Sequence, residues 1–189
     1  MTLPRKPGRP PLLHRDDILA AAVAVIDAEG LEALTMRRLG AALGVAAMSL
    51  YRHFPNRDAV LSGVVARLTT STSYAVRDAW AVSLRSFAVA YRRMLLDHPR
   101  AVALLATHPI DAGTGLGLVA PLFEQFAAEG IDQEHAITVV QSVAVFTLGH
   151  VLAQVGGEPP DPATAPFYDA WFDAGLTAML RGFATTGEA

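Results

Sequence analysis

Four arginines stand close in the sequence to a stretch of small residues, and together they could contact a nucleic acid. The arginines are Arg37, Arg38, Arg52 and Arg57, and the stretch is Ala46-Ala47-Met48-Ser49. Guanidinium groups bind phosphate oxygens, which positions a protein on a duplex without reading its sequence. Small side chains at the start of a helix let it approach base edges in a major groove about 12 Å wide. An ordinary helical hairpin with solvated arginines has the same composition, and composition alone favours that alternative.

The six histidines carry neither a metal signature nor a catalytic one. His135 and His150 are fifteen residues apart, which corresponds to ~22 Å along a helix. His98 and His108 each lie next to or near a proline at an expected helix end, where a histidine is more often a surface residue or a partner of the helix dipole. The sequence has no nucleophile elbow, no phosphate-binding glycine loop and no close carboxylate pair on a cleft. We therefore expect no metal, no cofactor and no catalytic residue, with an all-α enzyme as the less favoured alternative.

Composition indicates a folded protein whose two ends differ in charge. The chain has 189 residues, of which 52% are hydrophobic and 17% charged, so it can bury a core. It has no uninterrupted apolar run long enough to span a membrane and no apolar segment typical of a secretory signal. The absence of cysteine excludes disulfides and thiolate chemistry and fits a cytoplasmic location. Residues 1–57 carry a net charge of +3 and the remainder −6, which suggests a polyanionic partner for the first segment alone.

Apolar residues recur at helical spacing along the chain, and the period-two alternation of strands is absent. A first helix extends from about Asp16 to Gly30, and Thr35 stands at the N-cap of a short second helix. Gly44 breaks this second helix, and a third is expected over about residues 46–53. The pattern predicts two short helices joined by a tight turn, which need the first helix as a partner because neither can bury enough surface alone.

The remainder of the chain also has the helical pattern. Asn56 can cap a fourth helix, and Gly113, Gly115 and Gly117 indicate a flexible connection. Two glycines and four prolines in residues 156–166 predict a long loop. Further helices are expected at about residues 78–97, 99–107, 118–129, 135–154 and 167–183. The predicted fold class is therefore all-α.

Three fragments occur in one order between Ile18 and Val65. They are Gly30-Leu31-Glu32-Ala33-Leu34-Thr35-Met36-Arg37, Leu43-Gly44-Val45 and Leu50-Tyr51-Arg52-His53-Phe54-Pro55-Asn56-Arg57-Asp58. Together they resemble the signature of the DNA-binding domain of the tetracycline-repressor (TetR) family. One such fragment alone would be weak, whereas all of them in the right order are a specific match. The resemblance implies a helix-turn-helix whose second helix enters the major groove of DNA.

The resemblance implies roles for individual positions. Thr35 would hydrogen-bond a phosphate at a helix N-terminus, where backbone donors and the helix dipole favour an anion. Residues 46–49 would face the bases, Tyr51 and His53 match phosphate-contacting positions, and Arg57 replaces the lysine usual in the family. The full expected set of DNA-binding residues is Arg5, Lys6, Arg9, Thr35, Arg37, Arg38, Ala46, Ala47, Met48, Ser49, Tyr51, Arg52, His53 and Arg57.

Two residues of the expected recognition helix depart from the family pattern. Ala46 stands where a capping serine is common, which costs about 1 kcal/mol of cap stabilisation. Met48 stands where glycine is frequent, so the groove-facing surface is bulkier and could contact a thymine methyl group.

The basic N-terminal arm allows two interpretations. Gly8-Arg9-Pro10 resembles the centre of an AT-hook, and a narrow A·T-rich minor groove attracts arginine electrostatically. Pro7 replaces the arginine that precedes the glycine in AT-hooks. A proline-rich tail without a binding role is the alternative.

Residues 78–183 resemble, more loosely, the ligand-binding half of the tetracycline repressors. The resemblance implies a homodimer whose interface is a four-helix arrangement of the helices near 135–154 and 167–183, and an apolar small-molecule pocket. The matching fragments are Trp80 with Leu84-Arg85, Tyr91-Arg92-Arg93-Met94-Leu95-Leu96, and Val145-Phe146-Thr147-Leu148-Gly149-His150-Val151-Leu152. Alignment places near the pocket Ser73, Phe87, Tyr91, Leu104, His108, Leu122, Phe146 and His150, for each of which core packing is the alternative role.

The same alignment bears on the effector. Tetracycline repressors bind their drug with Mg²⁺ through a histidine and a glutamate, and these positions align here with Leu104 and Ala153, which cannot ligate a hard cation. The asparagine that contacts the drug aligns with Phe87. These departures from the tetracycline-repressor pattern therefore favour a metal-free, more apolar effector for this sequence.

We thus expect a flexible basic arm (residues 1–14), a helix-turn-helix DNA-binding domain (15–60) and a ligand-binding and dimerisation domain (61–189). The expected function is that of a cytoplasmic repressor that binds a palindromic operator as a homodimer and is released by a small effector. A transcriptional activator on the same fold and a non-specific architectural DNA-binding protein are the alternatives.

Overall fold

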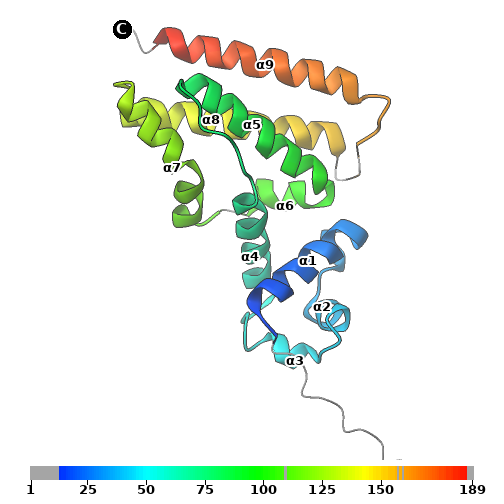
Figure 1. The fold of residues 1–189 in the computed structure, drawn as a ribbon. Coiled ribbons are helices and arrows are strands. Elements are labelled where there is room, and N and C mark those ends of the chain that lie inside the picture. The colour runs from blue at the N-terminus through cyan, green and yellow to red at the C-terminus, as the bar shows by residue number, and fades with distance from the viewer. Residues whose placement is uncertain (1–12, 109, 157, 159, 187–189) are drawn as a thin grey trace, which may run out of the picture.

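The computed structural model describes residues 13–108, 110–156, 158 and 160–186. Over these residues the regular secondary structure is entirely helical, which confirms the predicted fold class (Figure 1). In chain order the elements are α1 (Arg15–Glu29), the 3-10 turn η1 (Leu31–Ala33), α2 (Met36–Ala42), α3 (Ala47–Leu50), α4 (Arg57–Thr70), α5 (Trp80–Asp97), the 3-10 turn η2 (Pro99–Ala101), α6 (Val102–Thr107), α7 (Ala112–Ala128), α8 (Gln133–Val155) and α9 (Ala165–Thr186).

Local capping fixes the ends of the first helices as the sequence predicted. Gly30 ends α1 with a φ of +88°, a value that glycine adopts without steric cost. The Thr35 hydroxyl oxygen accepts a hydrogen bond of 3.0 Å from the backbone N–H of Arg38 and so caps α2. Asn56 caps α4 in the same way, since its side-chain oxygen accepts from the N–H of Ala59 at 2.8 Å.

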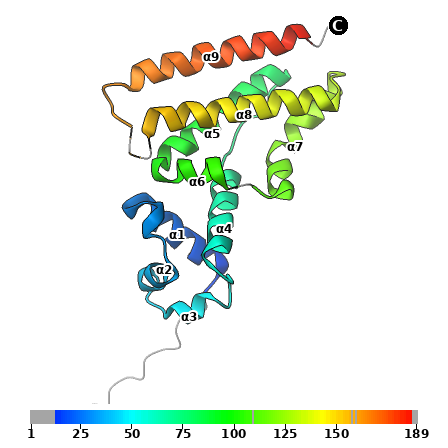
Figure 2. The same cartoon turned by 180° about the vertical axis from the view of Figure 1, so that it is seen from behind.

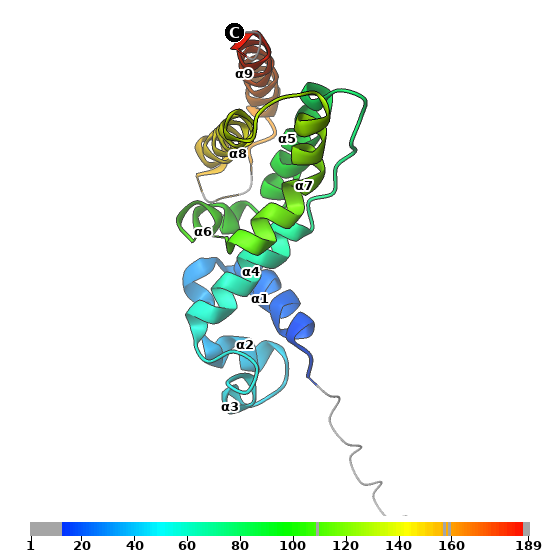
Figure 3. The ribbon, with the colours of Figure 1, turned by 90° about the vertical axis from the view of Figure 1, so that its left-hand side faces the viewer.

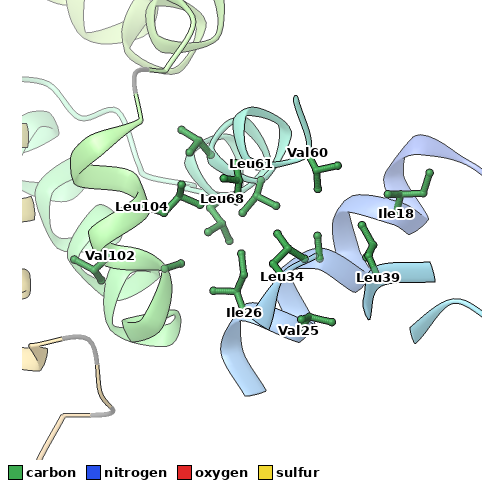
Figure 4. Close-up of a cluster of buried hydrophobic side chains, with 14 of the residues drawn as sticks. Ile18, Val25, Ile26, Leu34, Leu39, Val60, Leu61, Leu68, Val102 and Leu104 are labelled. Carbon is green, nitrogen blue, oxygen red and sulfur yellow. The ribbon is translucent and has the colours of Figure 1, made fainter. Parts of the chain in front are cut away.

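α4 connects the first three helices to the rest of the molecule. It packs against α1 on one side and contacts α6 and α7 on the other. Figure 4 shows one cluster of buried apolar side chains drawn from α1, α4 and α6, including Ile26, Leu61 and Leu104. Because a close-packed core transmits displacement rather than absorbing it, a shift of α4 must be accompanied by a shift of its neighbours. The predicted boundary between residues 60 and 61 lies inside this helix.

α8 is the central helix of the larger half. It contacts α5, α6, α7 and α9, and α9 lies along its outer side (Figures 1 and 2). By length and composition alone α8 could cross a membrane, and 39% of its most apolar window is buried. Packing against four helices accounts for much of this apolar composition, because a helix that is apolar on all sides must be covered on several of them.

Two expected helix bounds are wrong. Residues 113–117 are not a loop, since α7 begins at Ala112. The Asp111 carboxylate accepts a hydrogen bond of 2.9 Å from the N–H of Thr114, and this N-cap allows the helix to start among glycines. The third helix is shorter than predicted, because only Ala47–Leu50 are α-helical and residues 51–53 continue as a turn.

Candidate nucleic-acid interface and ligand cavity

The turn between α2 and α3 leaves the start of α3 on the surface. Gly44, with a φ of +67°, provides the left-handed residue that this turn requires. Leu50 of α3 is fully buried, whereas the Met48 side chain is 74% exposed. Ala47 and Ser49 are half-buried, so neighbouring protein does not enclose them. α3 lies at the end of the molecule opposite α9, where a duplex can reach it (Figure 3).

The distance between α2 and α3 depends on a glycine that the sequence reasoning missed. A Cβ atom at Gly40 would lie 2.9 Å from the carbonyl oxygen of Val45 and 3.2 Å from the backbone nitrogen of Ala47. Both neighbours are backbone atoms and cannot rotate away. A glycine inside a short helix is itself a signal of such a close approach. Gly40 therefore determines where α3 lies.

The predicted phosphate-binding arginines fall into two groups. Within the part of the chain that the structure describes, Arg37 and Arg52 are exposed and have no ion-pair partner. Arg38 instead pairs with Glu29, since its Nε lies 3.0 Å from both carboxylate oxygens. These hydrogen bonds hold the pKa of Glu29 below its ordinary value. Arg38 is thus partly neutralised by its own protein.

Arg57 and Arg15 bind backbone carbonyls in the segments that connect the first helices. Arg57 donates from Nε to the carbonyl of Leu34 at 2.6 Å and from Nη2 to that of Leu31 at 2.9 Å. Arg57 thereby connects the start of α4 to the segment that leads into α2. Arg15, which the sequence reasoning missed, donates to the carbonyl of His53 and lies 4.0 Å above the ring centre of Phe54. This is a cation–π contact.

The structure brings the other predicted DNA-contacting residues to the same end of the molecule. Thr35, Ala46, Tyr51 and Arg52 are exposed, and His53 is half-buried. All of them come from α2, α3 or the residues next to them. The predicted arm residues Arg5, Lys6 and Arg9 lie outside the described residues.

A cavity of about 470 Å³ lies between the larger helices. Its wall includes Val65 and Thr69 of α4, together with residues of α5, α6, α7 and α8. Three of the eight predicted ligand-binding residues line it, namely Phe87, Tyr91 and His108. This volume falls in the range of sites for drug-sized molecules.

The lining of this cavity is mostly apolar and carries no carboxylate, lysine or arginine among the residues that the structure describes. Its polar side chains include Thr69, Tyr91, His108 and Gln141. The Tyr91 ring stacks on Phe87 with centroids 5.8 Å apart and planes 9° apart. Burial raises the pKa of Tyr91 to about 12, so its hydroxyl stays neutral at physiological pH. His108 hydrogen-bonds through Nε2 to the carboxylate of Asp58 at 3.0 Å.

The other five predicted ligand-binding residues lie outside the cavity. Leu104 and Leu122 are fully buried in the apolar cores. Ser73 is exposed on the segment between α4 and α5, where it borders two open grooves. Phe146 and His150 face α9 and pack against its aromatic residues.

His150 occupies an aromatic cluster between α8 and α9. Its ring centre lies 4.8 Å from that of Trp171, 5.3 Å from that of Phe172 and 5.8 Å from that of Tyr168. The side chain is 4% exposed, and neither ring nitrogen has a hydrogen-bond partner among the described residues. Burial lowers the pKa of His150, and the nearby positive charge of Arg92 lowers it further. Both effects favour the neutral form of the ring.

Large apolar side chains remain uncovered on α8 and α9. Val145 is 69% exposed, Phe167 66% and Trp171 46%. With Leu152, which is 37% exposed, they give α8 and α9 an exposed apolar surface. These two helices lie toward the end of the molecule opposite α3 (Figure 1). Such a surface on a folded chain is typical of a protein–protein interface. Among the described residues, no group of three or more His, Asp or Glu side chains is placed to hold a metal ion.

Comparison with known proteins gives a family match for the N-terminal part of the chain and another for the C-terminal part. The family described as "Bacterial regulatory proteins, tetR family" matches residues 18–64, and the family described as "Tetracyclin repressor-like, C-terminal domain" matches residues 75–167. An HTH-type transcriptional regulator of Saccharopolyspora erythraea is 32% identical over 97% of this chain and 90% of its own length. The chain belongs to the TetR family.

Two further relatives support this membership. The class E tetracycline repressor protein of Escherichia coli is 30% identical over 75% of this chain and 69% of its own length. The crystal structure of a TetR variant from Acinetobacter baumannii in complex with minocycline superimposes with a TM-score of 0.82 at 25% identity, covering 94% of this chain and 99% of that one. The resemblance inferred from the residues is thus confirmed over both halves of this TetR-family protein.

Proposed function

We propose that this TetR-family protein is a transcriptional repressor that binds a palindromic operator as a homodimer and is released by a small effector. One observation carries the proposal: α4 lines the cavity with Val65 and Thr69 and, at its other end, is tied through Arg57 to the segment that leads into α2. The two ends of one helix therefore belong to the two candidate sites. The names of the relatives, which include tetracycline repressors, favour a repressor over an activator.

At the operator, the exposed face of α3 enters the major groove. Residues 46–49 approach the bases, with Met48 as the bulkiest contact, because its side chain is the longest of the four and is 74% exposed. Arg37 and Arg52 neutralise phosphates, and Thr35 and Tyr51 hydrogen-bond them. These contacts hold the helix in register, while the base contacts supply specificity. The arm residues Arg5, Lys6 and Arg9 add contacts in the adjacent minor groove.

Dimerisation sets the distance between the two copies of α3. The apolar surface of Val145, Leu152, Phe167 and Trp171 on α8 and α9 covers the same surface of a second copy. Two major-groove half-sites on one face of DNA are about 34–36 Å apart or a multiple of that. The dimer therefore binds only when its two copies of α3 have this separation. This assigns DNA binding to residues 15–60 and ligand binding and dimerisation to residues 61–189, with the protein acting on DNA in the cytoplasm.

The effector occupies the cavity and is small, uncharged and largely apolar. Burying an unpaired charge is costly, and the cavity offers no carboxylate, lysine or arginine among its described lining residues to pair with one. Gln141 and Thr69 can each hydrogen-bond a polar group of the ligand. Among the lining residues that the structure describes, no cluster fits a metal ion, so we propose a metal-free ligand.

The ligand acts by favouring one position of α4 over another. It can shift this equilibrium only by the difference in its affinity for the two states, typically 1–3 kcal/mol of coupling energy. Because α4 shares its buried cluster with α1 and α6, its displacement moves α1 and α2 with it. The separation of the two recognition helices then no longer matches the operator.

Selection of duplexes from the source genome by the purified protein tests this proposal. The bound fragments should share a two-fold symmetric motif, and a duplex carrying the motif should bind at least ~10³-fold more tightly than a random one. Equal affinity for both would contradict the proposal and favour a non-specific DNA-binding protein. A reporter gene placed behind the selected motif distinguishes repression from activation.

A further inference from the structure

The N-terminal part of α7 is a helix built from poor helix formers. Three of its first six residues, Gly113, Gly115 and Gly117, are glycines. Each glycine lowers the equilibrium constant for helix formation roughly fivefold relative to alanine. Their φ angles are not positive, so the backbone gives no conformational reason for glycine at these positions. Glycine here weakens the helix without serving a turn.

Pro121 weakens the same segment a second time. It lies inside α7 and has no N–H to donate to the carbonyl of Gly117, four residues earlier. The backbone hydrogen bond that would join the glycine-rich turns to the rest of the helix at this point is therefore missing. The two features act together on residues 112–117.

A strong anchor lies just beyond the weak segment. The Tyr74 hydroxyl donates a hydrogen bond of 2.8 Å to the carbonyl of Leu118. Further along α7, Leu122 and Phe126 are fully buried in the core. α7 is thus held firmly from Leu118 onward, whereas its first turns depend mainly on the Asp111 cap.

Residues 112–117 also separate the cavity from a groove on the surface. On one side, Ala112, Gly115 and Leu116 line the cavity of about 470 Å³. On the other side, Gly113 and Gly117 border an open surface groove of about 460 Å³. Because these two glycines have no side chains, they add no steric barrier to a movement of the helix toward the groove.

We propose that residues 112–117 form a gate that opens by local unfolding or outward displacement about Leu118 and gives ligands access to the cavity. This rests on the proposed role of the cavity as the effector site. In the present conformation residues 112–117 are helical, and the Asp111 cap acts as their latch. Opening requires the loss of the Asp111 cap and of the backbone hydrogen bonds that the carbonyls of residues 111–116 accept from the amides of residues 115–120.

Hydrogen exchange of the protein without any ligand tests the gate directly. Amides of residues 115–120 should exchange faster than those of residues 122–128 in the same helix. The double variant Gly113→Ala/Gly117→Ala should slow exchange in residues 115–120 by roughly 25-fold, the product of two fivefold effects. A Cβ fits at both positions, since at Gly117 nothing lies within 4 Å and at Gly113 the nearest atom is the Asp111 carboxylate oxygen at 3.4 Å.

Binding kinetics of an uncharged fluorescent probe, N-phenyl-1-naphthylamine, test what the gate does. In stopped flow, association and dissociation should both slow by roughly 25-fold in the double variant, so that Kd stays nearly constant. Asp111→Ala, which removes the latch, should speed both by about fivefold. Asp111→Asn retains capping and should match the unchanged protein, as should Gly182→Ala in α9, where a Cβ meets nothing within 4 Å.

The results of these experiments distinguish failure of the proposed gate from failure of the proposed effector site. Probe binding with equal rate constants in all variants would overturn the gate and leave the cavity as a ligand site. Exchange in residues 115–120 that is as slow as in residues 122–128, and unchanged by the alanines, would overturn it as well. Failure of any uncharged aromatic probe to bind would contradict the effector site, while the exchange data would still decide whether the wall opens.

Discussion

Replacing Gly40 by alanine should separate folding from operator binding. The new Cβ would lie 2.9 Å from the carbonyl oxygen of Val45 and 3.2–3.3 Å from the N and Cα atoms of Ala47, so α3 must move away from α2. Overpacking of this kind costs about 1–3 kcal/mol. Alanine inside α2 recovers about 1 kcal/mol through its higher helix propensity. The free energy of unfolding should therefore fall by no more than about 2 kcal/mol, which a typical domain tolerates.

Operator affinity should fall at least as much as stability. A base contact misplaced by a few tenths of an ångström loses its geometry, and each contact of this kind is worth about 1–3 kcal/mol. We therefore expect affinity to drop by at least about fivefold. Fluorescence anisotropy with the selected operator measures the affinity, and urea titration measures the stability. Ala41→Gly is the matched control, because it weakens the same helix at an exposed position without approaching α3. Unchanged affinity in Gly40→Ala would refute the placement of α3 as the recognition helix.

Four further changes probe the other features. Met48→Ala should alter which bases are preferred while leaving stability unchanged, as measured by binding to a library of operator variants. Arg52→Ala should lower affinity nearly equally for all sequences and reduce the slope of log K against log salt by about one unit. Val145→Asp should convert dimer to monomer in analytical ultracentrifugation, because the side chain is 69% exposed on the proposed interface. The pKa of His150 is lowered in the fold, so its contribution to stability should be complete above about pH 6.5 and decrease as pH falls below that value; urea midpoints of the His150→Phe variant should lack this component.

Helix ends were predictable where the cap is a local interaction. Thr35 and Asn56 each bond to a backbone N–H three residues later, and such contacts are visible in the sequence. The start of α7 was not predictable from glycine content. There a cap at Asp111 and the contact of Tyr74 with the carbonyl of Leu118, 44 residues away in sequence, stabilise a helix that propensity disfavours.

The cavity was only partly predictable because α8 is apolar on nearly all of its surface. Val140 and Gln141 face the cavity, whereas Phe146 and His150 face α9. Hydrophobic periodicity cannot say which face of such a helix packs against which neighbour. The predicted residues of α5, Phe87 and Tyr91, do line the cavity. Their helix has a clear apolar face, so its orientation follows from the sequence.

The arginines show why residue type alone underdetermines a nucleic-acid interface. Arg37 and Arg52 are exposed to solvent. Arg57 instead donates hydrogen bonds to two backbone carbonyls, and Arg38 forms an ion pair with Glu29. A guanidinium already bonded to carbonyl or carboxylate oxygens has fewer donors left for a phosphate and releases fewer counterions on binding. The salt dependence of operator binding should therefore reflect the cations that folding leaves free rather than the number of arginines in the segment. The hydrogen bonds that leave Arg57 fewer donors for phosphate also join α4 to the segment that leads into α2. Arg57 therefore contributes to the contact between the helix that lines the cavity and the helices next to α3.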